Sequence, residues 1–241
     1  MFDGFSQETV DFMWGIRFNN NREWFQSHKA EYQTHFQQPM TALADELWEF
    51  LSAKRPDAGL IRKVTRIYRD ARRLFGRGPY KDHLWFTVER PTAPTEEWTG
   101  KPCFWFELAP DYWSYGLGYW MPKPVTMAKL RARIDREPEP MERLTRRLTR
   151  NPEFTLETEE YRRARSEAPS EILAPWYRAK SFVIEHTGPL TEELYSRAIV
   201  ERIKKGYTFL LPYYDWLQAV DAEPEPDLYE RKRKHERISE S

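Results

Sequence analysis

The sequence is poor in cysteine, has no excess of either charge and contains no long apolar run. Its 241 residues include one cysteine, and 38 Lys and Arg balance 38 Asp and Glu. The single cysteine, Cys103, excludes a disulfide within the chain and every zinc site built on several cysteines. The charge balance leaves no overall field to draw the protein onto nucleic acid, which we do not expect as a partner. Any anion must therefore be bound by a local cluster of charges.

The sequence also lacks the signals that direct a chain into or across a membrane. Nowhere do eighteen apolar residues follow one another, and residues 1–5 carry no basic region followed by an apolar stretch. We therefore expect a cytoplasmic protein with no membrane partner. No cofactor motif is present either, and we expect no cofactor.

Aromatic residues, by contrast, are abundant. They make up 15% of the chain and include ten tryptophans, while the hydrophobic fraction is 40%. Because large rings bury much area per residue, these side chains can supply a core. The length suits one large domain. We expect a single α+β domain over residues 1–220 and a charged, frayed tail over residues 221–241.

Capping residues and apolar periods predict helices at both ends of the chain. Ser6 opens a helix over about residues 7–17, and Asn20 opens a second. Proline is tolerated best in the first turn of a helix, so Gln38-Pro39 predicts a break before a third helix, which ends near Arg55-Pro56. Later helices are expected around residues 130–134, at 141–148, over 192–205 with an end at Gly206, and from Pro212 onward.

The period changes from helical to alternating in the middle of the chain. Short links between the alternating segments favour hairpins and hence antiparallel pairing. The expected strands are residues 62–69, 83–89, 103–108, 112–119 and 180–186, with an exposed loop over 91–100. Together these elements predict an α+β fold, in which a mainly antiparallel sheet of about five strands is flanked by N-terminal and C-terminal helices.

One segment has the composition of a binding site. Residues 66–73 and 79–81 concentrate arginine, lysine and tyrosine, and guanidinium groups suit the oxygens of carboxylate and phosphate. In this interpretation an anion is held by four cations: Arg66, Arg69, Arg72 and Lys81. Three aromatic side chains form the wall of the pocket: Tyr68, Tyr80 and Trp120. One carboxylate, that of Asp70, orients an arginine.

The alternation of a strand divides this cluster. Arg66 and Tyr68 would lie on one face and Arg69 on the other, so the cations can serve one pocket only if the chain bends after Asp70. The alternative is a purely structural network, in which Asp70 and Glu107 neutralise the arginines. Because an unpaired charge in an apolar strand is costly, Glu107 is expected to have an arginine partner.

Other candidate sites have weaker support. His28, Glu31 and His35 share a helical face without a clear set of further ligands, and we expect no metal. Burial in an apolar strand should keep Cys103 protonated and unreactive. The adjacent residues Glu185-His186 would point to opposite faces of a strand and make a poor acid–base pair.

Several separated motifs occur in the order seen in one protein family. They are Gly4-Phe5, Asn19 to Phe25, Tyr32, Pro39-Met40, Arg66 to Asp70, Arg72, Pro79 to Lys81, Gly116 to Pro122 and Lys180 to Phe182. With them the chain resembles, to about Val220, the domain of unknown function numbered 2461. It departs at Arg73, where the family usually has an aromatic residue, and near Gly76, where it has an acidic one. The resemblance implies a single domain and no established activity.

We predict from these patterns a protein that binds a small anionic or phosphorylated ligand through the central cluster. The alternative is a non-enzymatic module that binds a protein partner through aromatic surface, with the arginine cluster purely structural. A concave pocket lined by the central arginines favours the first hypothesis, and a flat aromatic face favours the second. No catalytic residue is identifiable.

Overall fold

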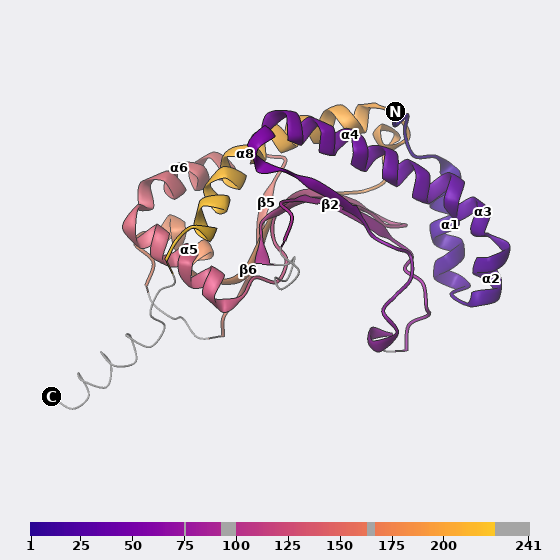
Figure 1. The fold of residues 1–241 in the computed structure, drawn as a ribbon, viewed down its shortest axis with the longest axis horizontal. Helices are drawn as coiled ribbons and strands as arrows, with labels where there is room; N and C mark the ends of the chain where they lie inside the picture. The colour runs from indigo at the N-terminus through magenta and orange to yellow at the C-terminus, as the bar shows by residue number, and fades with distance from the viewer. Residues whose placement is uncertain (75, 93–99, 163–166, 225–241) are drawn as a thin grey trace. The chain divides into compact units, whose positions relative to one another are not determined.

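The computed structural model describes residues 1–74, 76–92, 100–162 and 167–224 (Figure 1). Residues 93–99 of the expected loop and 225–241 of the expected tail lie outside this part of the chain. Two compact units make up the molecule. The first comprises Met1–Ala93, Cys103–Leu117 and Glu185–Leu210, and the second comprises the rest of the chain.

Helical segments come first and last in the chain, with most strands between them. The α-helices are α1 (Gln7–Phe18), α2 (Arg22–Ser27), α3 (Lys29–Glu31), α4 (Gln38–Lys54), α5 (Pro124–Arg136), α6 (Pro138–Thr149), α7 (Ala174–Arg178) and α8 (Ala198–Asp221). The strands are β1 (Ile61–Val64), β2 (Leu84–Glu89), β3 (Cys103–Leu108), β4 (Trp113–Tyr119), β5 (Thr155–Glu160) and β6 (Ala179–Gly188). A π-helical segment, η1 (Tyr32–Gln37), joins α3 to α4, and the 3-10 turns are η2 (Pro56–Ala58), η3 (Ala71–Arg73), η5 (Glu171–Leu173) and η6 (Glu192–Tyr195).

The strands form one antiparallel sheet in the order β1-β2-β3-β4-β6-β5. The α+β class and the antiparallel sheet are therefore confirmed, with six strands in place of about five. The sequence does not predict β5 because its segment, TLETEE, lacks an alternating set of apolar residues. This strand lies at the edge of the sheet, where one-sided pairing leaves polar side chains in water.

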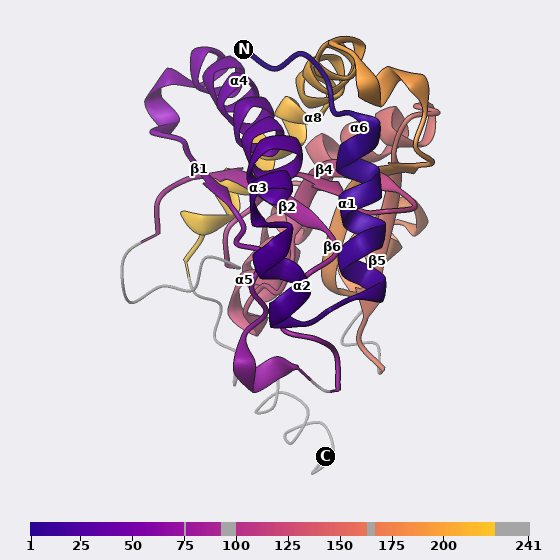
Figure 2. The ribbon, with the colours of Figure 1, turned by 90° about the vertical axis from the view of Figure 1, so that its right-hand side faces the viewer.

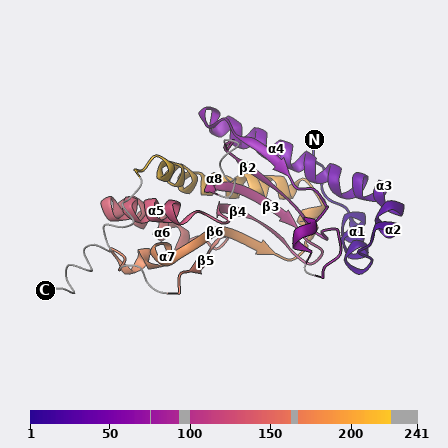
Figure 3. The same cartoon turned by 60° about the horizontal axis from the view of Figure 1, so that its bottom comes forward.

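In the first unit, helix α4 packs on strands β1 and β2 (Figure 3). The face of the sheet toward α4 is aromatic: Phe86 pairs in register with Phe106, and both rings are fully buried. The next register pair, Trp85 with Glu107, projects from the opposite face, because side chains alternate along a strand. One face thus forms the core, while the other carries polar and half-buried side chains.

The first helices begin close to the expected residues. Ser6 caps α1 in a capping box with Thr9, and α1 packs against η1 (Figure 2). The cap of α2 is Asn21, whose side chain accepts a hydrogen bond from the backbone N–H of Trp24 at 2.9 Å. The prediction that Asn20 opens this helix is wrong by one residue, because the Asn20 side chain is used in a distant contact.

The expected break at Gln38-Pro39 is also wrong, since η1 continues directly into α4. The backbone N–H of Gln38 donates to the carbonyl of Gln33, five residues earlier, as a π-helix requires. Pro39 has no N–H for the carbonyl of His35, four residues before it. The hydroxyl of Thr9 in α1 donates to that carbonyl instead, so a tertiary contact compensates for the proline.

Helix α8 contradicts two further boundary predictions. Gly206 was expected to end a helix and Pro212 to open the next, but both lie inside α8. A Cβ at Gly206 would lie 2.3 Å from the hydroxyl oxygen of the buried Tyr115, so this glycine makes room for a ring. Across the helices that the structure describes, none has the length and apolar content needed to cross a lipid bilayer.

In the second unit, α5 packs against α6, and β5 contacts α6 and α7. The hydroxyl of Tyr213 donates to the carbonyl of Leu144 at 2.9 Å, which fixes α8 to α6. Beyond α8, the carboxylate of Glu223 is buried and accepts hydrogen bonds from Arg133 and Arg136 of α5. These charge-assisted contacts hold the chain against α5 as far as Glu223.

One carboxylate in the first unit binds two cations. Glu46 of α4 lies 2.7 Å from Arg197 Nη2 and 3.0 Å from Lys204 Nζ. The hydrogen bonds from Arg197 are the largest cause that lowers the pKa of Glu46, to about 2. Arg197 also donates to the backbone carbonyl of Phe2, so the same group ties the N-terminal segment to α4.

Glu46→Gln should therefore destabilise the protein in a pH-dependent way. We expect a loss of about 1.5 kcal/mol in the free energy of unfolding at pH 7, the low end for hydrogen bonds to charged groups. The low end applies because the Arg197 side chain is 40% exposed. Since folding lowers this pKa, the contribution is complete above the ordinary value of 4.5 and is lost as the pH falls toward about 2.

Urea unfolding of both proteins at pH 7 and pH 3 measures this difference. The matched control is Glu49→Gln, an exposed position in the same helix, which should change stability little at either pH. Equal stability of Glu46→Gln and the unmodified protein at pH 7 would contradict the assignment.

Candidate functional site

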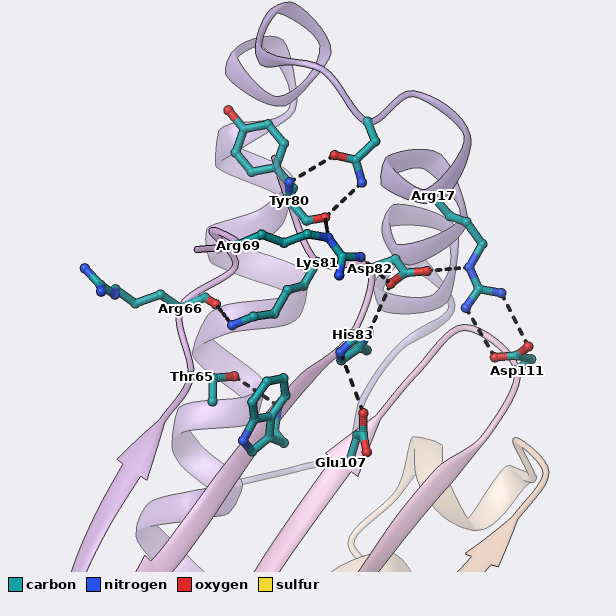
Figure 4. A network of polar contacts seen from close by, with 12 residues as sticks. Arg17, Thr65, Arg66, Arg69, Tyr80, Lys81, Asp82, His83, Glu107 and Asp111 are labelled. Atoms are coloured by element: carbon teal, nitrogen blue, oxygen red, sulfur yellow. Dashed lines mark hydrogen bonds and ion pairs between the residues drawn. The ribbon is translucent and has the colours of Figure 1, made fainter. Parts of the chain in front are cut away.

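The cation-rich segment and the return segment at residues 79–81 lie side by side in the first unit (Figure 4). Tyr68 and Tyr80 form an isolated antiparallel bridge. The backbone N–H of Lys81 donates to the carbonyl of Ile67 at 2.7 Å. The turn between the segments therefore brings Lys81 back beside the arginines.

Asn20 holds the return segment in place from the other side. Its Nδ2 donates to the carbonyl of Tyr80 at 2.9 Å, and its Oδ1 accepts from the N–H of Tyr80 at 3.0 Å. One side-chain amide thus satisfies both backbone groups of one residue, in the manner of a neighbouring strand. Gly78 makes this approach possible, because a Cβ there would lie 2.2 Å from Asn20 Oδ1.

The expected strand 62–69 ends early, at Val64, which corrects the prediction about its side chains. Thr65 explains this end: its N–H donates to the carbonyl of Trp85 at 2.9 Å, and its hydroxyl accepts from the N–H of Trp85 at 3.2 Å. The hydroxyl replaces a backbone acceptor, so the main chain is released from the ladder. The chain leaves the strand before Arg66 and not after Asp70, and strict alternation no longer separates Arg66 from Arg69.

A hollow with a volume of about 820 Å³ lies along this irregular segment, and we call it the cation hollow. Six of the eight predicted residues line it. Arg77, Thr65 and Val64 were not predicted; Arg77 stands just outside the two quoted motifs, in the turn between them. The lining residues are Val64, Thr65, Arg66, Tyr68, Arg69, Asp70, Arg72, Arg77 and Lys81.

The two remaining predicted residues are not among those that line this hollow. The ring of Tyr80 is buried and stacks on Phe25, with centroids 4.2 Å apart. Trp120 belongs to the second unit, where its side chain is 64% exposed and lines a different hollow of about 400 Å³. Tyr80 therefore supports the site from within the core, and Trp120 does not take part in lining the cation hollow.

The cations of the hollow differ in their partners. Asp70 binds Arg72, with the carboxylate 2.9 Å from Nη2. Arg69 donates from Nε to the carbonyl of Tyr80 at 2.7 Å and lies 3.5 Å from Asp82. Nζ of Lys81 donates to the carbonyl of Arg66 at 2.5 Å and lies 4.6 Å from the ring centre of Trp85.

Three of these cations lack an acidic partner. Within the part of the chain that the structure describes, no carboxylate pairs with Arg66, Arg77 or Lys81. Figure 4 shows the Arg66 side chain extending away from the polar network, while its backbone carbonyl accepts from Lys81. Burial, with smaller effects from Arg69 and Arg66, lowers the pKa of Lys81. The hollow therefore holds a local excess of positive charge in a chain whose net charge is zero.

Asp82 connects the hollow to helix α1 and strand β2. Its Oδ2 lies 2.5 Å from Arg17 Nε, and its Oδ1 lies 3.0 Å from His83 Nδ1 and 3.5 Å from Arg69 Nη2. His83 and then Arg17 hold the pKa of Asp82 well below its usual range, against the opposing effect of burial. The sequence motifs do not identify Asp82, although it directly follows Lys81.

The expected partner of Glu107 is corrected by this arrangement. Glu107 was expected to pair with an arginine, but its Oε1 lies 3.9 Å from Nε2 of His83 and its carboxylate accepts a hydrogen bond from Tyr112. Arg17 and Arg69 bind Asp82 instead. Burial raises the pKa of Glu107, because an incompletely compensated carboxylate is less favourable away from water.

Two earlier candidates can be placed as well. His28, Glu31 and His35 line one hollow of about 330 Å³ with Glu8 and Asp11. Among the residues described, however, no group of three or more His, Cys, Asp or Glu side chains is arranged to hold a metal ion. Cys103 is buried, and burial raises the pKa of its thiol to about 12, which agrees with an unreactive role.

A model of the conserved hypothetical proteins called DUF2461 matches residues 8–216, a range that holds the complete cation hollow and the Asp82 network. The chain belongs to the DUF2461 family. No curated protein matches the sequence. Membership in this family confirms the resemblance seen in the motifs and brings no activity with it.

Asn20→Ala should loosen the site of this DUF2461 protein. The substitution leaves the N–H of Tyr80 without its acceptor, at a cost of about 1–3 kcal/mol in the free energy of unfolding. The carbonyl of Tyr80 keeps its bond from Arg69. Urea unfolding measures the cost, and amide hydrogen exchange should become faster at Tyr80 and Lys81 while exchange in β2 stays as it is in the unmodified protein.

Asn19→Ala is the matched control. The neighbouring Asn19 is exposed, and its side chain donates only to the carbonyl of Gly15 at the end of α1. Asn19→Ala should lower the free energy of unfolding less than Asn20→Ala does, and it should leave amide hydrogen exchange at Tyr80 unchanged. Equal effects of the two variants would show that Asn20 does not position the return segment.

Proposed function

We propose that the cation hollow binds a small ligand through a phosphate or carboxylate group. The observation that carries the proposal is the set of three cations, Arg66, Arg77 and Lys81, without a carboxylate partner in the described chain. Like charges gathered without counter-charges repel one another, and a bound anion relieves this repulsion. Arginine supplies forked donors for the anion, and lysine supplies a compact charge.

The state of Lys81 supports the same conclusion. Its ammonium is half-buried, and one of its three donors is used by the carbonyl of Arg66. Burial and the neighbouring arginines favour the neutral form, which is expressed in the lowered pKa. An anion in the hollow would favour the charged form, so ligand binding and protonation of Lys81 stabilise each other.

Tyr68 adds an aromatic wall to the hollow. Its side chain is 52% exposed although it packs at its edges on Phe25 and Tyr80, with ring centres 5.9 and 5.4 Å apart. Part of the Tyr68 ring is packed on other rings and the rest is exposed, which suits a ligand that has an apolar or planar part next to its anionic group. This arrangement favours a phosphorylated organic molecule over a free inorganic ion.

The alternative function, a protein-interaction module, has narrower support. Trp120 and its neighbour Met121 are both exposed in the hollow of the second unit. Scattered exposed apolar side chains are normal on a protein surface, whereas unpaired cations that converge on one hollow are not. The anion-binding function therefore has the stronger basis.

Thermal unfolding with inorganic phosphate and pyrophosphate tests the proposal. Selective binding to the native state stabilises it, by about 2.7 kcal/mol when the ligand is at a hundredfold excess over its Kd. We expect a rise in Tm of several degrees relative to chloride at equal ionic strength. Lys81→Met should abolish most of this rise, since methionine keeps the apolar stem beside Trp85 and removes the charge.

The matched control is Arg143→Met, at an exposed position of α6 in the second unit, since Arg143 does not line the cation hollow. This variant should respond to phosphate as the unmodified protein does. General salting effects act on all three proteins alike, so only the difference between variants counts. An equal rise in Tm for Lys81→Met and Arg143→Met would overturn the proposal.

Phosphate binding should also weaken with rising pH in the alkaline range. Deprotonation of Lys81 removes one of the charges that hold the anion, and its lowered pKa places this loss at a lower pH than for an ordinary lysine. Isothermal titration between about pH 8 and pH 10, where the charge of phosphate itself changes little, measures the effect. Lys81→Met should show no such decline.

A further inference from the structure

Next to the cation hollow, the polar face of the sheet carries a histidine and a carboxylic acid that face each other. His83 precedes β2 by one residue, and Glu107 in β3 lies opposite Trp85 in the register. His83 Nε2 and Glu107 Oε1 are 3.9 Å apart, and both side chains are partly exposed (Figure 4). This distance is too long for a direct hydrogen bond and leaves both atoms open to a third group.

Asp82 determines which nitrogen of the neutral His83 ring is protonated. Its carboxylate lies 3.0 Å from Nδ1, and Arg17 and Arg69 keep it ionised. An ionised carboxylate can only accept a hydrogen bond, so Nδ1 carries the proton of the neutral ring. The lone pair of the neutral ring is then on Nε2, on the side of Glu107.

Glu107 presents the complementary group. Burial raises its pKa, and the hydroxyl of Tyr112 donates to it. A lone pair that faces an ionised carboxylate is repelled by it, whereas one proton between the two makes the contact attractive. The proton can lie on His83, which then forms an ion pair with Glu107, or on Glu107, which then faces a neutral ring.

We propose that His83 and Glu107 share one proton and form an acid–base pair, positioned by Asp82, that transfers protons to and from a ligand anchored by its phosphate in the cation hollow. The ligand part of this inference rests on the proposed function. Two residues connect the acid–base pair with the cation hollow. Lys81 lines the hollow and lies over the ring of Trp85, and this ring stacks on His83 with centres 5.6 Å apart. Arg69 lines the hollow and reaches Asp82.

The ligand class follows from this geometry. It is a small organic phosphate whose reacting atoms extend from the hollow along Trp85 to His83. The lone pair of Nε2 takes a proton from one atom of the ligand, whose bonding electrons stay on the ligand, and protonated Glu107 gives a proton to a second atom. Because both side chains are partly exposed, the imidazolium then gives its proton to water and the Glu107 carboxylate takes one from water. This exchange restores the pair, so no oxidant, reductant or further reactant is consumed.

The test uses the full chain labelled with ¹³C in glutamate carboxyls and ¹⁵N in histidine rings. Titration by NMR should show the Glu107 carboxyl changing charge above the ordinary range, and the signals of His83 and Glu107 should both report the same two steps. His83→Gln should move the Glu107 midpoint to still higher pH, because the imidazolium no longer favours the carboxylate. The exposed Glu201 is the internal control and should not move.

Asp82→Asn tests the positioning role. The ¹⁵N shifts should show Nδ1 as the protonated nitrogen of neutral His83, and the variant should lose this preference. If neutral His83 of the variant still carries its proton on Nδ1, Asp82 does not determine the tautomer of His83. If either variant fails to fold, the shared two-step titration of the unmodified protein still decides, since separate single-step curves for His83 and Glu107 would overturn the pair.

Inorganic phosphate separates this inference from the proposed function. Bound phosphate should shift the titration of Glu107 in the unmodified protein and should not do so in Lys81→Met. Phosphate that raises Tm but leaves the His83 and Glu107 signals unmoved would overturn the connection between pair and hollow. If phosphate does not bind but His83 and Glu107 still show a coupled titration, the proposed function and its ligand are overturned and the acid–base pair stands.

Discussion

The contact between the Asn20 amide and the backbone of Tyr80 is the constraint on which the candidate site depends. It joins residues that are sixty positions apart and satisfies a donor and an acceptor of the return segment at once. The isolated bridge to Tyr68 and the hydrogen bond from Arg69 Nε to the Tyr80 carbonyl hold the other side of this segment. Lys81, Asp82 and His83 follow directly, so the positions of the cation, the carboxylate and the imidazole all derive from this contact. Gly78 is required for the same reason, because no side chain fits beneath the amide.

Asp82 determines how charge is distributed around the site. Its carboxylate binds Arg17 and Arg69, so its negative charge is compensated before it reaches the other cations of the hollow. Lys81, although adjacent in sequence, is left with a carbonyl and a ring as its contacts. The result is a separation of functions over three residues: Lys81 contributes charge to the hollow, Asp82 forms the structural ion pairs, and His83 turns toward Glu107. Strand-like alternation before β2 explains why Lys81 and His83 both contact Trp85.

Aromatic packing supplies the rigidity behind these polar groups. Phe25 stacks on Tyr80 and meets Tyr68 at its edge, so the two tyrosines of the bridge rest on one buried ring. On the core face of the sheet, Phe86 and Phe106 are stacked and fully buried. Well-packed rings limit the movement of the backbone that carries them. The high aromatic content of the chain thus serves the core and the support of the site more than an exposed surface.

The sequence by itself determined the elements with a strong local period, the antiparallel α+β class, the burial of Cys103 and the place of the cation cluster. These follow from contacts within a few residues, which alternation, helical periods and caps report directly. Only the tertiary structure decided that β1 ends at Val64, that Arg77 joins the hollow while Trp120 does not line it, and that Glu107 faces His83 in place of an arginine. The first and the last of these outcomes depend on partners distant in sequence: Trp85 for Thr65, and Asp82 for Arg17. A local pattern has no access to such partners, because their approach is set by packing and by the competition among all carboxylates for the same arginines.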